Sequence, residues 1–386
     1  MINITDKTKC TGCGACVNIC PKSAIDFRED KAGYRYPIVN KSKCVDCSLC
    51  EKVCPIINPL STEENYKEPI VKAAWNIDEE IRVNSTSGGV FSAIADKFIE
   101  DGGYVIGAEY TEDFGIRHVV IDSKEKIKRI RQSKYAQSDL GDVFKTIKKL
   151  LKADKKVLFC GSPCQAAGLK KYLNKSYNNL FLVDFICRGI ISQKIYKKYL
   201  DSVERRSNSK ITKVHFKNKD FGWNRFSTKL SLANGEKYHK DRYHDEYMVG
   251  YLKYNLYLRP CCHDCKFKTL PRVSDISLGD FWGIANSDAS LDNDQGTSVV
   301  MINSEKGLSY FNELSEMLFS TDSTIDEVVK GNSCLLSIAP KGEYSDYFYK
   351  NFRKKDFIEL IHKIEKKDYF KRLNFKEKIY YLIKRK

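Results

Sequence analysis

One stretch decides how the sequence is understood: Cys10-Thr-Gly-Cys13-Gly-Ala-Cys16-Val-Asn-Ile-Cys20-Pro21. The same spacing returns 34 residues further on, in Cys44-Val-Asp-Cys47-Ser-Leu-Cys50-Glu-Lys-Val-Cys54-Pro55. Eight of the 15 cysteines in this 386-residue chain therefore lie within its first 54 residues. A twofold repeat of this length predicts two half-modules that pack face to face.

This spacing is the pattern of bacterial two-cluster ferredoxins, in which three cysteines of a run bind one four-iron cluster and the fourth binds the other cluster. The pattern predicts two crossed ligand sets. They are Cys10, Cys13, Cys16 and Cys54 for cluster one, and Cys44, Cys47, Cys50 and Cys20 for cluster two. Zinc sites typically use two separated C-x-x-C pairs, so two complete runs argue against zinc. Residues 1–60 are thus predicted to form a two-cluster 4Fe–4S domain.

The composition excludes several classes of protein. Hydrophobic residues make up 42% of the chain and aromatic residues 12%, which excludes a wholly disordered chain. No run approaches the roughly 18 consecutive apolar residues of a membrane span. The first residues also lack a signal-peptide pattern. We therefore expect a cytoplasmic protein, in which clustered cysteines bind metal or do redox work more often than they form disulfides.

The formal net charge is +16, from 66 Lys and Arg and 50 Asp and Glu. A four-iron cluster with four thiolate ligands carries about −2, so three such clusters lower the net charge to about +10. A basic surface suits an acidic electron carrier such as a ferredoxin or flavodoxin. No nucleic-acid motif is present. Membrane contact is expected at most peripherally, through the basic run at residues 378–386.

Beyond a polar linker at residues 58–69, the pattern predicts an α+β fold, with a mixed α/β core at residues 70–305 and a Lys-rich helical C-terminal extension at residues 306–386. Within the core, strands are predicted at residues 157–160 and 180–186 around a helix at residues 165–173, which is a parallel βαβ unit. Residues 104–109 and 117–121 are predicted to form a strand pair. Residues 211–217 and 228–232 are predicted to be antiparallel strands, followed by the turn residues Asn234-Gly235.

Four further cysteines are candidates for a third cluster. Cys164 lies at a strand-to-helix turn, Cys187 follows the next strand, and Cys262 and Cys265 form a C-x-x-C pair. Buried free cysteines and a zinc site are alternatives. A redox thiol pair of Cys160 and Cys164 is another, because a helix N-terminus lowers a thiol pKa. Cys261 and Cys334 fit no pattern and receive no assignment.

Residues 85–89, Ser-Thr-Ser-Gly-Gly, precede an apolar-periodic helix at residues 90–99. Hydroxyls and glycines at the start of a helix suit an anion such as a flavin pyrophosphate, because backbone N–H groups and the helix dipole point at it. An ordinary N-cap is the alternative. The six histidines show no paired metal spacing, so no catalytic histidine is assigned.

Several motifs of the middle segment now occur in a recognisable order. They are residues 87–90 (Ser-Gly-Gly-Val), 132–138 (Gln-Ser-Lys-Tyr-Ala-Gln-Ser), 161–169 (Gly-Ser-Pro-Cys-Gln-Ala-Ala-Gly-Leu), 184–189 (Asp-Phe-Ile-Cys-Arg-Gly), 258–267 (Leu-Arg-Pro-Cys-Cys-His-Asp-Cys-Lys-Phe), 272–283 and 294–298. Residues 1 to about 305 resemble the coenzyme F420 hydrogenase/dehydrogenase beta-subunit family, joined to an N-terminal two-cluster ferredoxin domain.

The resemblance implies FAD and a four-iron cluster in the core, and electron transfer between iron–sulfur centres and a two-electron acceptor or donor, of which a deazaflavin is one. The positions matching the family's core cysteines are Cys164, Cys187, Cys262 and Cys265. Ser87, Gly88 and Gly89 match a flavin-contacting segment. This chain departs from the family in having Arg188 where the family usually shows His, in the additional Cys261, and in its extension.

The sequence therefore predicts an FAD- and iron–sulfur-dependent oxidoreductase that exchanges electrons with a low-potential carrier, ferredoxin or flavodoxin, and acts on a small-molecule substrate. Two alternatives remain open. One is a thiol–disulfide reductase that uses Cys160 and Cys164. The other is a non-catalytic electron-transfer subunit of a larger complex. Family resemblance indicates cofactors better than it indicates the substrate.

Overall fold

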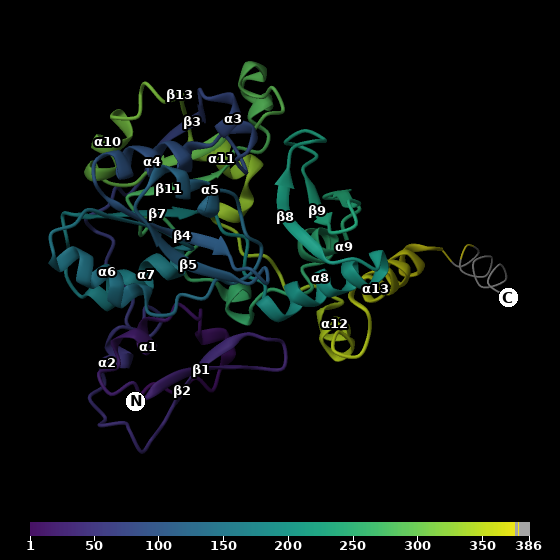
Figure 1. The fold of residues 1–386 in the computed structure, drawn as a ribbon, viewed down its shortest axis with the longest axis horizontal. Coiled ribbons are helices and arrows are strands. Elements are labelled where there is room, and N and C mark those ends of the chain that lie inside the picture. The colour runs from purple at the N-terminus through teal and green to yellow at the C-terminus, as the bar shows by residue number, and fades with distance from the viewer. Residues whose placement is uncertain (375–376, 378–386) are drawn as a thin grey trace.

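The computed structural model describes residues 1–374 and residue 377. Its N-terminal part is built of short elements and lies against one end of the remaining molecule (Figure 1). The elements are η1 (Lys7–Lys9), α1 (Ala15–Ile19), β1 (Ile25–Glu29), β2 (Arg35–Val39) and α2 (Leu49–Lys52). Strands β1 and β2 form an antiparallel hairpin. Helices α1 and α2, each holding the third cysteine of one run, contact each other, so the two halves of the repeat meet as predicted.

An eight-stranded mixed sheet forms the centre of the molecule, in the order β13-β3-β12-β11-β7-β6-β4-β5. The middle strands β11, β7, β6 and β4 are parallel, and the remaining neighbours pair antiparallel. The strands are β3 (Ile70–Asn76), β4 (Tyr104–Tyr110), β5 (Ile116–Ile121), β6 (Val157–Cys160), β7 (Leu180–Phe185), β11 (Ile276–Asp280), β12 (Ser298–Ile302) and β13 (Leu318–Ser323). The predicted βαβ unit (β6, α7, β7) and the strand pair (β4, β5) are confirmed.

Helices cover both faces of this sheet, so the core has three layers. Alternating side chains of one strand serve the two faces: Leu158 packs on one side, and Val157 and Phe159 pack on the other. The first face carries α4 (Val90–Glu100), α5 (Ile127–Ile130) and α10 (Glu305–Asn312); the second carries α6 (Val143–Lys152), α7 (Pro163–Leu173) and α11 (Ile325–Gly331). The fold is α+β, as the sequence predicts.

A second lobe lies beside the sheet and contains a three-stranded antiparallel sheet in the order β10-β9-β8 (Figure 1). Its strands are β8 (Ile211–Asn218), β9 (Ser227–Leu232) and β10 (Lys237–Asp241), and its helices are α8 (Gln193–Ser207), α9 (Glu246–Met248), α12 (Ser345–Asn351) and α13 (Phe357–Arg372). The predicted antiparallel pair is confirmed, and Gly235, with φ 85°, turns the chain into β10. Short helical turns complete the chain at α3 (Glu79–Val83), η2 (Lys124–Lys126), η3 (Val249–Lys253), η4 (Pro260–Asp264), η5 (Ile284–Asn286), η6 (Ala289–Leu291) and η7 (Ser333–Leu335).

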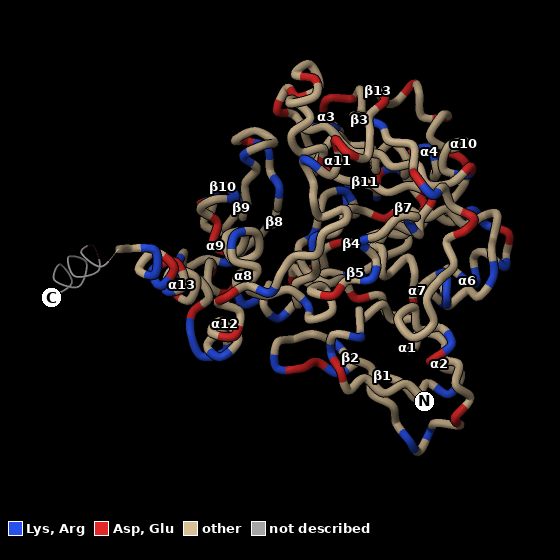
Figure 2. Tube along the Cα trace, turned by 180° about the vertical axis from the view of Figure 1, so that it is seen from behind, with Lys and Arg blue, Asp and Glu red and all other residues tan. Residues whose placement is uncertain are grey.

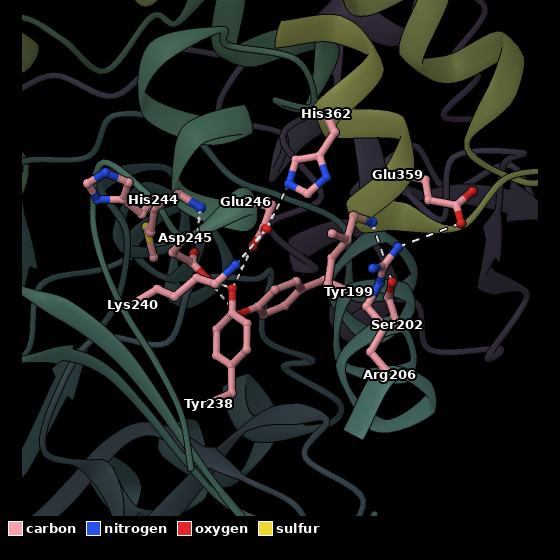
Figure 3. A network of polar contacts seen from close by, with 12 residues as sticks. Tyr199, Ser202, Arg206, Tyr238, Lys240, His244, Asp245, Glu246, Glu359 and His362 are labelled. Carbon is pink, nitrogen blue, oxygen red and sulfur yellow. Dashed lines mark hydrogen bonds and ion pairs between the residues drawn. The ribbon is translucent and has the colours of Figure 1, made fainter. Parts of the chain in front are cut away.

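Buried polar contacts hold helix α13 onto this lobe (Figure 3). The hydroxyls of Tyr199 and Tyr238 donate to the Asp245 carboxylate at 2.7 Å and 2.8 Å. The neighbouring Glu246 contacts Lys240 at 2.7 Å and His362 of α13 at 3.0 Å. Burial raises the pKa of Asp245 to about 6. Helix α13 is therefore part of the lobe.

The segment after residue 305 differs from the wholly helical extension predicted for it. Strand β13 pairs with β3 at the edge of the central sheet, and Phe319 stacks on Trp75 with ring centroids 4.0 Å apart. The composition of the segment is Lys-rich, but this short edge strand has one solvent-facing side, so its polar residues do not prevent pairing. The basic run at residues 378–386 lies outside the described residues. No helix within the described residues is long and apolar enough to cross a membrane.

Candidate functional site

Two small hollows lie inside the N-terminal part, each bordered by four cysteines. Hollow one is bordered by Cys10, Cys13, Cys16 and Cys54. Hollow two is bordered by Cys20, Cys44, Cys47 and Cys50. Each hollow takes three cysteines from one run and the fourth from the other run, which is the crossed grouping that the repeat predicts.

Left-handed backbone positions wrap each run around its hollow. Gly12 and Gly14 have φ angles of 71° and 78° in the first run, and the equivalent residues of the second run, Asp46 and Ser48, have φ angles of 49° and 59°. Residues other than glycine rarely adopt this conformation. The left-handed conformation recurs at equivalent positions of the two runs although the residues differ. The two halves therefore share the backbone path around the hollow rather than the residue type.

A third hollow lies between the N-terminal part and the core. All four candidates for the third ligand set border it, namely Cys164, Cys187, Cys262 and Cys265. Cys164 is in the first turn of α7, Cys187 follows β7, and the last two lie in and just after η4. The unassigned Cys261 and Cys334 border the same hollow. The fold thus brings the β6–α7–β7 unit, which carries Cys164 and Cys187, together with the segment around η4, which carries Cys262 and Cys265.

Hydrogen-bond donors and cations border hollow three, although burial raises the pKa of Cys164, Cys187 and Cys265. The backbone N–H of Ile190 donates to Cys262 Sγ at 3.4 Å, and Ser162 Oγ lies 3.2 Å from Cys164 Sγ. Five cationic side chains also border the hollow: Lys9, Arg188, Lys266, Lys268 and Arg272. Positive charge and N–H donors stabilise the deprotonated thiols that bind metal. In the part of the chain that the structure describes, no three His, Cys, Asp or Glu side chains converge on a single-ion site.

The main cavity, of about 510 Å³, opens at the carboxyl ends of β6, β7 and β11. Cys160, Asp184 and Asp280 mark these strand ends on its wall. The N-terminal turn of α4 forms another part of the wall. Open α/β sheets bind ligands outside the carboxyl ends of their parallel strands, and cavities of this size suit cofactors. This cavity is therefore the candidate cofactor site of the core.

The Ser87-Gly88-Gly89 segment leads into α4 at this cavity. Ser87 and Gly89 line the cavity, whereas Gly88 lies behind them, where a Cβ atom would be 2.4 Å from the Ala74 carbonyl oxygen. Gly89 is the N-cap, with φ 84°, and no side chain caps the helix. The alternative of an ordinary side-chain N-cap is therefore not observed. The helix N-terminus stays available to an anion.

The charged side chains of the main cavity are mostly cationic. Its carboxylates are Asp184 and Asp280, and its cations are Arg131, Lys134, Arg188, Lys217 and Arg242. Both carboxylates are already paired, Asp184 with Arg272 at 2.8 Å and Asp280 with Lys217. None of the three lining arginines forms an ion pair with a residue that the structure describes. The cavity consequently suits an anionic ligand, and sequence reasoning identified none of these cations as cavity residues.

Three lining residues also present polar atoms that lack a hydrogen-bond partner among the described atoms: His118 Nδ1, Asp184 Oδ2 and Arg188 Nε. Buried polar atoms are normally paired, so these atoms point to a polar ligand. Burial lowers the pKa of His118 to about 4, so its imidazole is neutral at neutral pH. No histidine was assigned a role from the sequence. His118 comes to lie beside the cavity only when β5 is placed in the sheet, and no local motif marks it.

The geometry does not support the Cys160–Cys164 thiol pair. All fifteen cysteines lie within the described residues and all are free. Cys160 lines the main cavity and Cys164 borders hollow three. Burial raises the pKa of Cys160 to about 12, which is opposite to the low pKa that a nucleophilic thiol needs. Burial also raises the pKa of Cys164, against the expected effect of the helix N-terminus.

Hollow one, hollow three and the main cavity follow one another through shared wall residues. Hollows one and three share Lys9, Thr11 and Ile56. Hollow three and the main cavity share Cys187 and Arg188, together with Gly189, Ile190 and Cys334. Arg188, which replaces the usual histidine of the resemblance, donates to Asn255 Oδ1 at 2.7 Å and to Cys334 Sγ at 3.7 Å. A cation therefore stands in the wall between hollow three and the cavity.

Comparison with protein families agrees with this arrangement. Residues 9–56 match the 4Fe-4S dicluster domain. Residues 71–145 match the N-terminal model of the coenzyme F420 hydrogenase/dehydrogenase beta subunit, and residues 154–327 match the C-terminal model of that same family. The chain is an iron–sulfur redox protein. It belongs to the coenzyme F420 hydrogenase/dehydrogenase beta-subunit family, as the sequence motifs indicate.

No curated protein matches the chain. Among solved structures, the chain is similar to one in the F420-reducing [NiFe] hydrogenase complex from Methanosarcina barkeri. The two are 18% identical, with a TM-score of 0.47, over 80% of this chain and 94% of that chain.

Proposed function

We propose that this protein is an FAD- and iron–sulfur-dependent oxidoreductase that transfers electrons between a one-electron carrier and a two-electron reaction in the main cavity. The observation that carries the proposal is that hollow one, hollow three and the cavity are joined by shared wall residues, with hollow two in the same N-terminal part as hollow one. Each hollow is bordered by the four cysteines of one predicted ligand set. Electron transfer and iron–sulfur chemistry are properties of the family.

In this proposal each hollow holds one four-iron cluster. Cluster one takes Cys10, Cys13, Cys16 and Cys54; cluster two takes Cys20, Cys44, Cys47 and Cys50; cluster three takes Cys164, Cys187, Cys262 and Cys265. The wall shared by hollows one and three keeps clusters one and three close. Thiolate ligation also explains why so many cysteines in one part of the chain remain free of disulfides.

FAD fits the main cavity. The uncapped N-terminus of α4, with Ser87 and Gly89 on the wall, would hold the pyrophosphate, and Arg131 would balance its charge. Gly88 lets the loop lie against the Ala74 carbonyl oxygen, where no side chain fits. When bound, the flavin supplies the conversion between one-electron and two-electron steps. The protein's part is to orient it, to exclude water and to present neutral His118 at the wall.

The substrate is proposed to be a small two-electron acceptor or donor, for which the family suggests a deazaflavin. Another part of the cavity wall is aromatic: Arg242 lies over Phe226 and Trp282 at 4.9 Å and 5.5 Å from the ring centroids. A guanidinium without an ion-pair partner among the described residues, beside aromatic rings, suits a planar, anionic compound.

An acidic carrier is proposed to dock where hollow two reaches the surface. Cys47 is exposed, and the exposed lysines of this end include Lys41 and Lys43. Neither lysine forms an ion pair with a described residue. Residues 124–175 add a wider positive field, since they contain 15 Lys and Arg and only four Asp and Glu. Figure 2 shows these cations along α6, near the N-terminal part.

The deciding experiment is anaerobic purification or reconstitution, with iron, sulfide and flavin quantified. Three clusters predict about twelve iron and twelve sulfide per chain, together with one FAD. About eight iron would contradict cluster three, and a chain that binds no flavin would contradict the proposed cofactor.

A second candidate is a non-catalytic electron-transfer subunit. The observation that favours it is that the matched family is itself described as a beta subunit of a hydrogenase or dehydrogenase. Assays of the isolated chain separate the two candidates. An oxidoreductase reduces a two-electron acceptor with a carrier or dye as donor, whereas an electron-transfer component of this kind reduces its clusters but shows no turnover until a partner chain is added.

A further inference from the structure

Arg259 is fully buried at the boundary between the N-terminal part and the core, with 0% of its side chain exposed. Its Nε donates to the Cys10 carbonyl oxygen at 2.8 Å. One terminal nitrogen donates to Cys10 Sγ at 3.6 Å and to the Arg35 carbonyl oxygen at 2.8 Å. The other donates to Gln137 Oε1 at 3.0 Å. The guanidinium is thus fixed against the first cysteine of hollow one.

No carboxylate balances this charge. Arg259 forms no ion pair with any residue that the structure describes, and its partners other than Cys10 are carbonyl oxygens, an amide and aromatic rings. The rings of Tyr36 and Tyr34 lie 4.5 Å and 5.6 Å from the guanidinium carbon. A buried charge without a counter-charge is strongly unfavourable. The position therefore requires an anion, and Cys10 Sγ is the group that can supply it.

The core contains a contrasting buried arginine. Arg272 is 3% exposed and is paired with the buried Asp184 at 2.8 Å. At Arg272 the chain therefore supplies a carboxylate from the protein itself. Arg259 has no such carboxylate, as expected where a bound anionic cofactor balances the charge of the guanidinium.

We propose that Arg259 is the counter-charge of the cluster in hollow one and raises its reduction potential. This inference rests on the proposed function, because it needs a cluster bound by Cys10. Reduction adds negative charge to a cluster, so a fixed cation and a hydrogen bond to a ligand sulfur favour the reduced state. Arg259 acts through Cys10 and is a positioning residue rather than a catalytic one.

The effect does not extend to hollow two. The hydrogen bonds to ligand sulfurs at hollow two come from neutral backbone N–H groups, of Ala24 to Cys20 Sγ at 3.2 Å and of Ile2 to Cys50 Sγ at 3.3 Å. Exposed lysines near hollow two are screened by water and salt. Cluster two therefore serves as an internal reference in the same molecule. Arg259 also precedes Cys262 by three residues and accepts a hydrogen bond from its backbone N–H at 2.8 Å, so its charge acts on the cluster of hollow three as well.

The test is an EPR-monitored redox titration of the full-length holoprotein. Arg259→Gln is expected to lower the potential of cluster one by at least 59 mV, which is a tenfold change in the ratio of reduced to oxidised cluster. The potential of cluster two should not change. Cys47→Ala combined with Cys265→Ala, which removes one ligand of cluster two and one of cluster three, leaves the signal that belongs to cluster one. Arg35→Gln is the matched control, because it removes an equal charge from a 38% exposed side chain of the same part.

Gln137→Glu provides a second variant in case Arg259→Gln fails to assemble clusters. It leaves Arg259 in place but gives the guanidinium a carboxylate partner, so the same downward shift of cluster one is expected. An unchanged cluster-one potential in whichever of these variants assembles overturns the inference. So does an equal shift in Arg35→Gln. If the wild-type protein binds fewer than two N-terminal clusters, the proposed function itself fails, and iron analysis reports that separately.

Discussion

The two halves of the cysteine repeat have the same backbone but different surroundings. The inner half, residues 10–20, faces the core, and the outer half, residues 44–54, faces solvent. Left-handed positions in the inner half are glycines, whereas their counterparts in the outer half are Asp46 and Ser48. A Cβ atom on Gly12 would lie 2.6 Å from Gln137 Nε2 and 3.1 Å from the Arg259 guanidinium, while Asp46 is exposed.

The contrast between the two halves shows that a glycine can be needed for two reasons, the backbone conformation and the lack of space for a side chain. The wrap around a cluster needs left-handed backbone in both halves, and the exposed Asp46 and half-buried Ser48 tolerate it with a modest penalty. Contact with the core adds a second requirement in the inner half, because no side chain fits. The same contact brings Arg259 to the inner half alone. The repeat therefore predicts two equivalent clusters, but the fold makes them unequal.

The largest test of the comparison concerns the crossed ligands. Cys20→Ala should abolish cluster two, although Cys20 belongs to the inner run, and Cys54→Ala should abolish cluster one. Each variant should lose about four of about twelve iron. EPR of the remaining clusters, with iron analysis, measures the outcome. Loss of cluster one in Cys20→Ala, with cluster two intact, would contradict the crossed grouping.

A second test asks whether the inner half passes electrons on through hollow three. Cys265→Ala removes a proposed ligand that borders hollow three but not the main cavity. Carrier-driven reduction of the flavin should fall about 100-fold, at the upper end of losses at damaged metal sites. Reduction by a small dye should change little, because a dye reaches the flavin directly. Stopped-flow absorbance follows both reactions. Unchanged carrier-driven reduction would exclude hollow three from the path.

A third test exchanges residues between the halves. Gly12→Ala should destabilise the N-terminal part by about 2–3 kcal/mol, since the left-handed backbone costs about 1–2 kcal/mol with a Cβ atom and Gln137 must also move. Asp46→Gly should stay within about 1 kcal/mol of the wild type. Anaerobic denaturant titrations that follow cluster absorbance measure both. Equal effects in the two variants would show that contact with the core is not what distinguishes the halves.

The smallest effect concerns docking at the outer half. Lys41→Glu with Lys43→Glu should slow carrier-driven cluster reduction about tenfold at low ionic strength. The difference should vanish near 1 M salt, where the Debye length is about 3 Å. Lys149→Glu with Lys152→Glu on α6 makes the same change of charge away from hollow two and should slow the reaction less. A larger effect of the α6 pair would place the docking surface beside the inner half.

The sequence predicted the parts of the site whose residues are close in the chain. The two cysteine runs carry their grouping in their spacing, and the β6–α7–β7 unit follows from a strand, a turn and a helix in succession. The structure also places Cys164 and Cys187 at one hollow with Cys262 and Cys265, as predicted from strand ends. These signals depend on local geometry, which a single sequence records.

Contacts between residues that are far apart in the chain could not be predicted from the sequence. His118, Arg242 and Arg259 are unremarkable in sequence, and their roles arise only when β5, the second lobe and η4 meet the cavity or the N-terminal part. Strand β13 was missed because its pattern of one buried residue among polar ones carries no strong period. Ser87, Gly88 and Gly89 were predicted as one flavin contact, but the close approach to Ala74 puts Gly88 behind the cavity wall.

The seam between the N-terminal part and the core has a kinetic consequence. Tyr34 donates from its hydroxyl to the Tyr257 carbonyl oxygen at 2.8 Å, and Ser192 donates to the Ala32 carbonyl oxygen. Gly168 of α7 lies so close to Cys13 that a Cβ atom there would be 2.9 Å from its sulfur. These contacts hold the N-terminal part in a fixed position against the core. Internal electron transfer should therefore proceed at the same rate in glycerol as in water, whereas a tethered, diffusing domain would slow with viscosity.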